Sequence, residues 1–95
     1  MLFRSSADSL YELAYLALEM DELEKAEDYF NLSLKRDNFT VPSYKSNINY
    51  WLGNIYEKKG DLFKAHEYYV KHGDIYFVHL IMAKIYKSEI GRAHV

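Results

Sequence analysis

The sequence predicts an all-α fold of about five helices, arranged as antiparallel hairpins. Apolar residues recur at three- and four-residue spacing in several stretches, which is the period of a helix with one buried face. One Pro and four Gly among 95 residues are too few for the many turns of a β-sandwich. Hydrophobic residues make up 49% of the chain and charged residues 27%, so one small domain has enough of both for a packed core and a solvated surface.

The first helix is expected to begin near Ser6. The pattern Ser9-x-x-Glu12 resembles a capping box, which satisfies backbone N–H groups at the start of a helix. The apolar residues of this stretch have helical spacing and would form one buried face, and they are Leu10, Leu13, Ala14 and Ala17.

The second helix is predicted over residues 23–36, after a turn at Met20, Asp21 and Glu22. In that turn Asp21 is a plausible N-cap, with Glu24 as its reciprocal partner. The apolar side of the second helix is formed by Leu23, Ala26, Phe30 and Leu34.

A linker precedes the third helix, because Pro42 cannot continue the second one. The third helix is predicted from Ser43 or Ser46 to about Lys59, with two different faces. One face carries Ile48, Leu52 and Ile55, with Tyr56 beside it, and the other carries Asn47, Tyr50, Trp51, Asn54 and Lys58.

The fourth and fifth helices follow each other closely. Asp61 is expected to cap a helix over residues 62–72, and Gly73 is expected to end it. Asp74 would then cap a fifth helix over residues 75–88. This last helix is apolar nearly all round, and such a helix is normally covered on more than one side. We therefore expect its outer side to be exposed, and the chain either to be marginally stable or to self-associate through residues 75–86.

The last six residues, 90–95, read IGRAHV and resemble the translation of a common sequencing adapter. Segments of this kind are set aside before the fold is considered. We expect this tail to be non-native, which would make the chain a fragment of a longer protein.

Several classes of function are disfavoured by the sequence. The net charge of −2 does not provide the basic face that nucleic-acid binding requires. The chain has no Cys, and the spacing of His66, His72 and His79 does not match the i, i+4 pair of a helical zinc site. The sequence also has no nucleophile elbow and no phosphate-binding loop. We expect no enzyme activity, no cofactor and no metal.

Membrane association is disfavoured as well. The N-terminus has no apolar run long enough for a signal peptide. The helices mix charges of both signs, whereas an interfacial helix has a basic polar face. We therefore expect a cytoplasmic protein that does not bind membranes.

The stretch from Leu52 to Tyr69 resembles a known repeat. Leu52, Gly53, Tyr56, Ala65 and Tyr69 have the spacing of the tetratricopeptide repeat, whose signature is W-x2-L-G-x2-Y followed by A-x3-F. Asn49 stands where the Trp would be, and no Pro ends the repeat. An earlier copy in the same register is formed by Leu13, Ala14, Ala17, Ala26 and Phe30. The small residues at the helix crossings are expected to be buried, and they are Ala14, Ala26, Gly53 and Ala65.

The resemblance also implies how the chain is divided. A repeat fragment over residues 1–89 would contain a first repeat at about 7–40, a linker at 41–45, a second repeat at about 46–74 and the first helix of a third at about 75–88. The equivalent alanines of the two repeats are 39 residues apart, and the family period is about 34 residues. The surplus falls in the loop that contains the linker, where insertions leave the stacking of hairpins intact.

In this family the first helix of each hairpin lines a concave groove that binds a peptide or a partner surface. The resemblance therefore implies a non-catalytic protein–protein interaction module. The groove positions that it implies are Tyr11, Tyr15, Asn47, Tyr50, Trp51, Asn54 and Lys58, with Asp8 and Glu12 beside the first two. Tyr and Trp offer large, rigid contact areas with a polar tip, as binding hot spots do. The alternative is that Tyr15, Tyr50 and Trp51 pack only against an adjacent repeat.

Other functions remain open. The repeats could be the sensor or scaffold arm of a larger signalling regulator, such as a transcription factor or a histidine kinase, or they could be a self-association module. Family members that grip the C-terminal carboxylate of chaperone tails use a Lys and an Asn four residues apart on the first groove helix. Tyr11 and Tyr15 occupy those places here, so an adaptor for chaperone tails is disfavoured.

Overall fold

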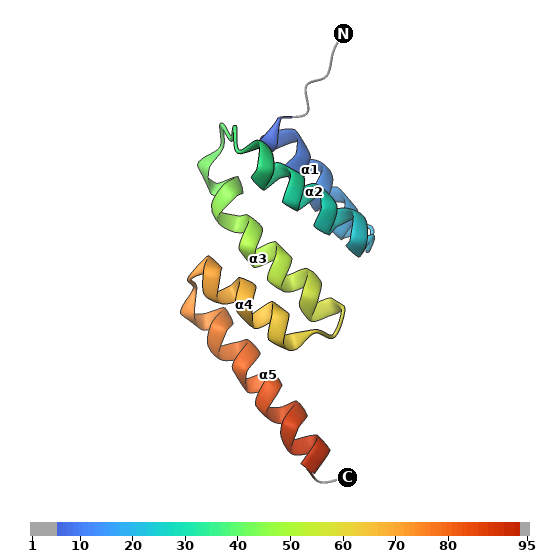
Figure 1. Cartoon of the computed structure of the whole chain (residues 1–95), viewed down its shortest axis with the longest axis vertical. Helices are drawn as coiled ribbons and strands as arrows, with labels where there is room; N and C mark the ends of the chain where they lie inside the picture. The colour runs from blue at the N-terminus through green and yellow to red at the C-terminus, as the bar shows by residue number, and fades with distance from the viewer. Residues whose placement is uncertain (1–5, 94–95) are drawn as a thin grey trace. The chain divides into compact units, whose positions relative to one another are not determined.

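The computed structural model describes residues 6–93, which contain five α-helices and no β-strand (Figure 1). The all-α prediction is therefore confirmed. The chain divides into a first unit, Met1–Ile48, and a second unit, Asn49–Val95, with the boundary inside the third helix. The helices are α1 (Ala7–Glu19), α2 (Leu23–Arg36), α3 (Pro42–Lys58), α4 (Leu62–His72) and α5 (Ile75–Ala93).

Helices α1 and α2 lie side by side and antiparallel in the first unit (Figure 1). Two hydrogen bonds tie the start of α1 to the end of α2. The Ser33 hydroxyl donates to the carbonyl oxygen of Ala7 at 2.7 Å, and the Ala7 N–H donates to Asn38 Oδ1 at 2.7 Å. Ser33 is fully buried, and this bond satisfies its hydroxyl, as a buried polar group requires. The apolar pattern of the sequence did not predict this contact.

Helix α1 begins near Ser6, as predicted, and its N-cap is Ser6 and not Ser9 of the suspected capping box. The Ser6 side chain accepts a hydrogen bond from the Ser9 N–H at 3.1 Å. Its buried face differs from the predicted one. Leu13 is 45% exposed, whereas Leu18 is buried. Leu18 lies four residues after Ala14 and therefore on the same stripe, while Leu13 is turned away from Ala14 by roughly 100°.

The turn between α1 and α2 contains a left-handed residue, and the prediction that Asp21 is an N-cap was wrong. Asp21 has a φ of 60°, and the Glu22 N–H donates to the carbonyl oxygen of Ala17 at 2.8 Å. This is the hydrogen bond of a Schellman motif, in which the residue beyond the helix adopts the left-handed conformation. Asp21 thus ends α1, and the N-cap of α2 is Glu22, which makes no side-chain capping bond.

The second unit contains the same turn 39 residues later. Gly60 has a φ of 86°, and the Asp61 N–H donates to the carbonyl oxygen of Tyr56 at 2.9 Å. The same offset of 39 residues separates Ala26 from Ala65. The two hairpins therefore share their sequence register and the hydrogen bonds of their turns.

Helix α4 has the predicted bounds. Asp61 is its N-cap and accepts a hydrogen bond from the Lys64 N–H at 3.1 Å. Gly73 ends the helix with a φ of 89°, a conformation that glycine adopts without strain. After it, Asp74 accepts a hydrogen bond from the Tyr76 N–H at 3.0 Å, which fits its predicted role at the start of α5.

The core of the second unit forms around Ala65, Tyr69 and Ile81. Gly53 lies against the Tyr69 ring so closely that a Cβ at residue 53 would be 2.8 Å from Tyr69 Cε1. The four small residues of the repeat pattern are all buried, as the sequence predicted, and they are Ala14, Ala26, Gly53 and Ala65.

Two helices have different ends from those predicted. Helix α3 begins at Pro42, so residues 42–45 of the expected linker are helical. Pro suits the first turn of a helix, because the N–H that it lacks would have no partner there. Helix α5 extends to Ala93 and so includes part of the suspected tail, whose residues 94–95 lie outside the described range.

The substitution Gly53→Ala is expected to lower the free energy of unfolding by about 1–2 kcal/mol. The added methyl group must displace the buried Tyr69 ring, which costs about 1–3 kcal/mol, and the higher helix propensity of Ala returns at most about 1 kcal/mol. Urea denaturation followed by circular dichroism measures the change. The matched control is Gly91→Ala in α5, where an added Cβ meets no atom within 4 Å. If the Gly53→Ala variant were as stable as the control, the close contact between Gly53 and the Tyr69 ring would be contradicted.

Candidate binding site

A hollow in the first unit is lined by residues of α1 and of the first turn of α3. Its volume is about 430 Å³, and its lining residues are Tyr11, Glu12, Tyr15, Leu16 and Tyr44. The predicted groove residues Tyr11 and Tyr15 lie four positions apart on α1, so they fall on the same face of the helix. The structure therefore brings both of them to one concave surface.

The hollow is built on a stack of aromatic rings. Tyr11 and Tyr44 lie parallel, with ring centroids 4.1 Å apart and an angle of 10° between the rings. The Tyr11 ring also packs edge-on against Phe30 of α2 at 5.6 Å, and Tyr11 is only 7% exposed. Tyr15, in contrast, is 39% exposed. Tyr11 and Tyr44 therefore support the wall of the hollow, and Tyr15 presents contact area to solvent.

Glu12 adds a negative charge to the hollow. The Tyr44 hydroxyl donates to Glu12 Oε2 at 2.9 Å. This hydrogen bond, together with desolvation and the negative charge of Glu12, raises the pKa of Tyr44 above its usual value. The sequence did not predict the contact, because it joins α1 to a residue that follows the loop after α2.

Asp8 is held by the loop that follows α2. The Thr40 N–H donates to its carboxylate at 3.1 Å, and the Thr40 hydroxyl donates to Oδ2. The hydroxyl bond is the main reason why the pKa of Asp8 lies below its usual value. The carboxylate thus fixes the loop, although the family resemblance implied that Asp8 would lie beside the groove.

In the second unit, the predicted groove residue Tyr50 lies among other rings. Its centroid is 4.8 Å from that of Trp51 and 4.7 Å from that of Phe77. Tyr69 and His72 lie at 6.0 and 5.7 Å. Tyr50 also packs against the buried core of this unit, so much of its ring serves packing. Trp51 is half-buried and lies at the edge of this aromatic cluster.

The remaining predicted groove residues are polar and differ in exposure. Asn47 and Asn54 are half-buried, and Lys58 is exposed. Asn54 makes a side-chain hydrogen bond with the Tyr69 hydroxyl. Asn54 therefore has a structural contact in addition to its proposed place in the groove.

Glu57 connects α4 and α5, a role that the sequence analysis did not identify. Its carboxylate accepts a hydrogen bond from the Tyr69 hydroxyl at 2.8 Å and forms an ion pair with Lys84 Nζ. The sequence contained two indications of this contact. A buried Tyr hydroxyl needs a hydrogen-bond partner, and Glu57 lies four residues after Gly53 on the same face of α3. Burial of the Tyr69 ring and its bond to Glu57 raise the pKa of Tyr69 far above its usual value.

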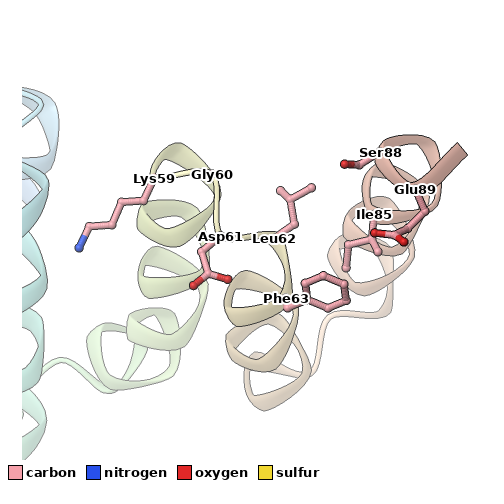
Figure 2. Close-up of a pocket in the computed structure, with 8 residues that line it drawn as sticks. All are labelled: Lys59, Gly60, Asp61, Leu62, Phe63, Ile85, Ser88 and Glu89. Atoms are coloured by element: carbon pink, nitrogen blue, oxygen red, sulfur yellow. The ribbon is translucent and has the colours of Figure 1, made fainter. Parts of the chain in front are cut away.

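A second hollow, of about 290 Å³, lies beside the turn between α3 and α4 (Figure 2). Figure 2 shows Phe63 of α4 pointing toward Ile85 of α5, whereas Lys59 and Asp61 point away from α5. The charged groups therefore do not converge on one point, as groups that share a chemical step would have to do.

Metal sites and membrane spans are also absent from the described part of the chain. No group of three or more His, Cys, Asp or Glu among these residues could hold a metal ion. None of the helices in residues 6–93 combines the length and the apolar character needed to cross a lipid bilayer.

Comparison with known proteins gives one match. A family model described as "Tetratricopeptide repeat" matches residues 7–40 and 46–71, which together are more than half of the chain. The matched ranges contain the hairpin of α1 and α2, most of α3 and all of α4 except its last residue. No curated protein and no solved structure matches the chain.

The raised pKa of Tyr69 predicts a loss of stability at alkaline pH. In the unfolded chain a Tyr loses its proton at about pH 10, while in the folded chain Tyr69 keeps its proton to higher pH. The stability that protonated Tyr69 gives to the folded chain is therefore fully present below about pH 10. Above this pH, the titration of Tyr69 lowers the free energy of unfolding by about 1.4 kcal/mol per pH unit. Urea denaturation over a series of pH values measures this slope.

The variant Tyr69→Phe removes the ionisable group and is expected to flatten the alkaline decline. Tyr76→Phe, which alters an exposed ring, serves as the control and should keep the steep decline of the wild type. Equal slopes for the wild type and Tyr69→Phe would show that Tyr69 does not cause the loss.

Proposed function

This chain belongs to the tetratricopeptide repeat family, and from that premise we propose that it binds a peptide or partner surface through a concave groove. Repeats of this family generally mediate protein–protein interaction. The proposed groove runs along the first helix of each hairpin, and no catalytic step is assigned to the chain.

The observation that carries the proposal is the aromatic hollow of the first unit. Its wall includes Tyr11 and Tyr15, the two groove positions that the family resemblance implies for α1. A concave surface with rigid aromatic walls and a few polar groups is typical of a site that anchors one side chain of a ligand. Within the second unit the proposed groove positions are Tyr50, Trp51, Asn54 and Lys58, and Asn47 is a further proposed position within the first unit.

The proposed division into repeats follows the same resemblance. We propose a first repeat at about 7–40 and a second at about 46–74, and the intervening residues 41–45 include the first turn of α3. Helix α5 would then be the first helix of a third repeat, at about 75–88. The turns at Asp21 and Gly60 support this division, because they have the same hydrogen-bond pattern.

The groove is tested with peptides selected from a random display library against the whole chain. We expect Trp51→Ala to weaken binding of the selected peptides by about 5- to 30-fold, because truncating an aromatic anchor costs on the order of 1–2 kcal/mol. Fluorescence anisotropy measures the affinity, and circular dichroism should show unchanged helicity. Phe63→Ala is the control, since Phe63 is an exposed ring outside the proposed groove. If the Trp51→Ala variant unfolds, Trp51 belongs to the core. If the variant binds the peptides with unchanged affinity, Trp51 does not belong to the groove.

Self-association is a second candidate function, and α5 favours it. Several large apolar residues of α5 are exposed, namely Ile75 at 65%, Tyr76 at 65%, Met82 at 51% and Tyr86 at 68%. Soluble monomers rarely expose a contiguous apolar patch of this kind. A second copy of the chain could cover this side of α5.

We expect sedimentation velocity to show a concentration-dependent dimer. The double variant Met82→Lys and Tyr86→Lys is expected to shift it to monomer, because a closed interface would bury the new charges. Val70→Lys, which places a charge at an exposed apolar position of α4, is the control and should leave the dimer intact. A compact monomer at all concentrations of the wild type would exclude this function.

A further inference from the structure

The hollow of the first unit combines aromatic faces with one negative charge. Three of its five lining residues are Tyr, one is Glu12, and none is Lys or Arg. Helix α1 carries Asp8, Glu12 and Glu19 and has no basic residue at all. The chemistry of the hollow therefore suits a cation better than an anion.

The distribution of charge along the chain points the same way. Residues 1–48 contain nine Asp and Glu against five Lys and Arg, a net charge of −4. Residues 49–95 contain five Asp and Glu against seven Lys and Arg, a net charge of +2. The two values together give the net charge of −2 of the whole chain. The first unit therefore attracts positively charged groups. The pKa of Tyr44 is raised mainly by its hydrogen bond to Glu12 and by desolvation, and the negative charges of Glu12 and Asp8 add to this shift.

The nearest basic residue in sequence is already engaged. Lys45 follows Tyr44 directly, and its Nζ is 2.7 Å from Asp37 Oδ1. Lys45 therefore compensates the charge of Asp37. The carboxylate of Glu12 accepts the Tyr44 hydroxyl on Oε2, and a carboxylate has acceptor sites on both of its oxygens. Glu12 can therefore keep this bond and still accept a donor from a ligand.

We propose that this hollow binds a basic side chain of a partner peptide, with Arg preferred over Lys. The aromatic rings that line the hollow attract a cation through their quadrupoles, and Glu12 supplies the opposite charge. Arg is preferred because its planar guanidinium stacks on aromatic rings and pairs with carboxylates through two donors. The exposed Leu16 offers apolar contact to the methylene stem of such a side chain. This proposal rests on the proposed function, since it names the chemistry of the peptide that the groove takes.

The test compares three measurements on the whole chain. Peptides are selected from a random display library and aligned for a recurring Arg or Lys. A selected peptide is then synthesised with Arg and with citrulline, a neutral side chain of nearly the same shape, and both affinities are measured by fluorescence anisotropy. We expect citrulline to bind about 3- to 30-fold more weakly, the range typical of cation–π and charge-assisted contacts. High salt is expected to narrow the difference.

The matched variants are Glu12→Gln and Glu19→Gln. Both remove one negative charge from α1, and the amide introduced by Glu12→Gln keeps an oxygen that can accept the Tyr44 hydroxyl. We expect only Glu12→Gln to reduce the preference for Arg over citrulline. Tyr15→Leu, which keeps apolar bulk without a phenol ring, should reduce the same preference. Thermal melts followed by circular dichroism show whether each variant is folded.

The outcomes separate this inference from the function on which it rests. Selected peptides that carry no recurring basic residue, or that bind equally well with citrulline, would overturn the inference and leave peptide binding in place. A library that yields no binder would overturn both. If sedimentation shows a dimer that Glu12→Gln dissociates and Glu19→Gln does not, the hollow is filled by a second copy, and the inference fails.

Discussion

The close approach between Gly53 and the ring of Tyr69 is the contact on which the second unit depends. With no side chain at residue 53, the backbone of α3 can lie directly against the Tyr69 ring, which is only 2% exposed. The same ring packs against Phe77 of α5, at a centroid distance of 5.7 Å. Its hydroxyl reaches Glu57, which also pairs with Lys84 of α5. One aromatic residue on α4 therefore links the second half of α3 to α5 through both apolar and polar contacts.

The first unit forms a hairpin of the same kind but stabilises it with different polar contacts. Phe30 occupies in the first repeat the position that Tyr69 occupies in the second, 39 residues later. A Phe ring has no hydroxyl and therefore makes no hydrogen bond like that of Tyr69 to Glu57. Its ring is fully buried and contacts the edge of Tyr11. The polar links are instead at the start of α1, where Ser33 and Asn38 bond the backbone of Ala7. The apolar register is thus common to both repeats, while each repeat satisfies its polar groups in its own way. This is expected because helix crossings require small and large residues at set positions, whereas a polar group requires only a partner within reach.

The same distinction explains how much of the molecule could be predicted from sequence. Helix α4 was predicted to the residue, because Asp61 and Gly73 are local signals that act within one turn of the helix. Asp21 was misassigned because Asp serves both as an N-cap and in left-handed positions, and the choice depends on how the preceding helix ends. Leu13 fits the repeat signature and yet is exposed, since a degenerate repeat retains the residue type without the contact. Tyr11 and Tyr15 were assigned to the groove by the family resemblance, and their four-residue spacing puts them on one face of α1. The contact of Tyr11 with Tyr44 depends on the path of the loop at 37–41, which local patterns do not encode.

The two candidate surfaces differ in the kind of partner that each can hold. The hollow of the first unit combines aromatic rings with one carboxylate, and the hydrogen bond from Tyr44 to Glu12 is present without a ligand. A preorganised site of this kind loses little conformational entropy when a ligand binds, and it therefore suits ligands that bind reversibly. The exposed side of α5 is largely apolar and gains by being covered permanently. Because the two surfaces share no residue, a change that removes one leaves the chemistry of the other intact. The proposed peptide recognition and the proposed self-association therefore use different residues, and each can be tested without the other.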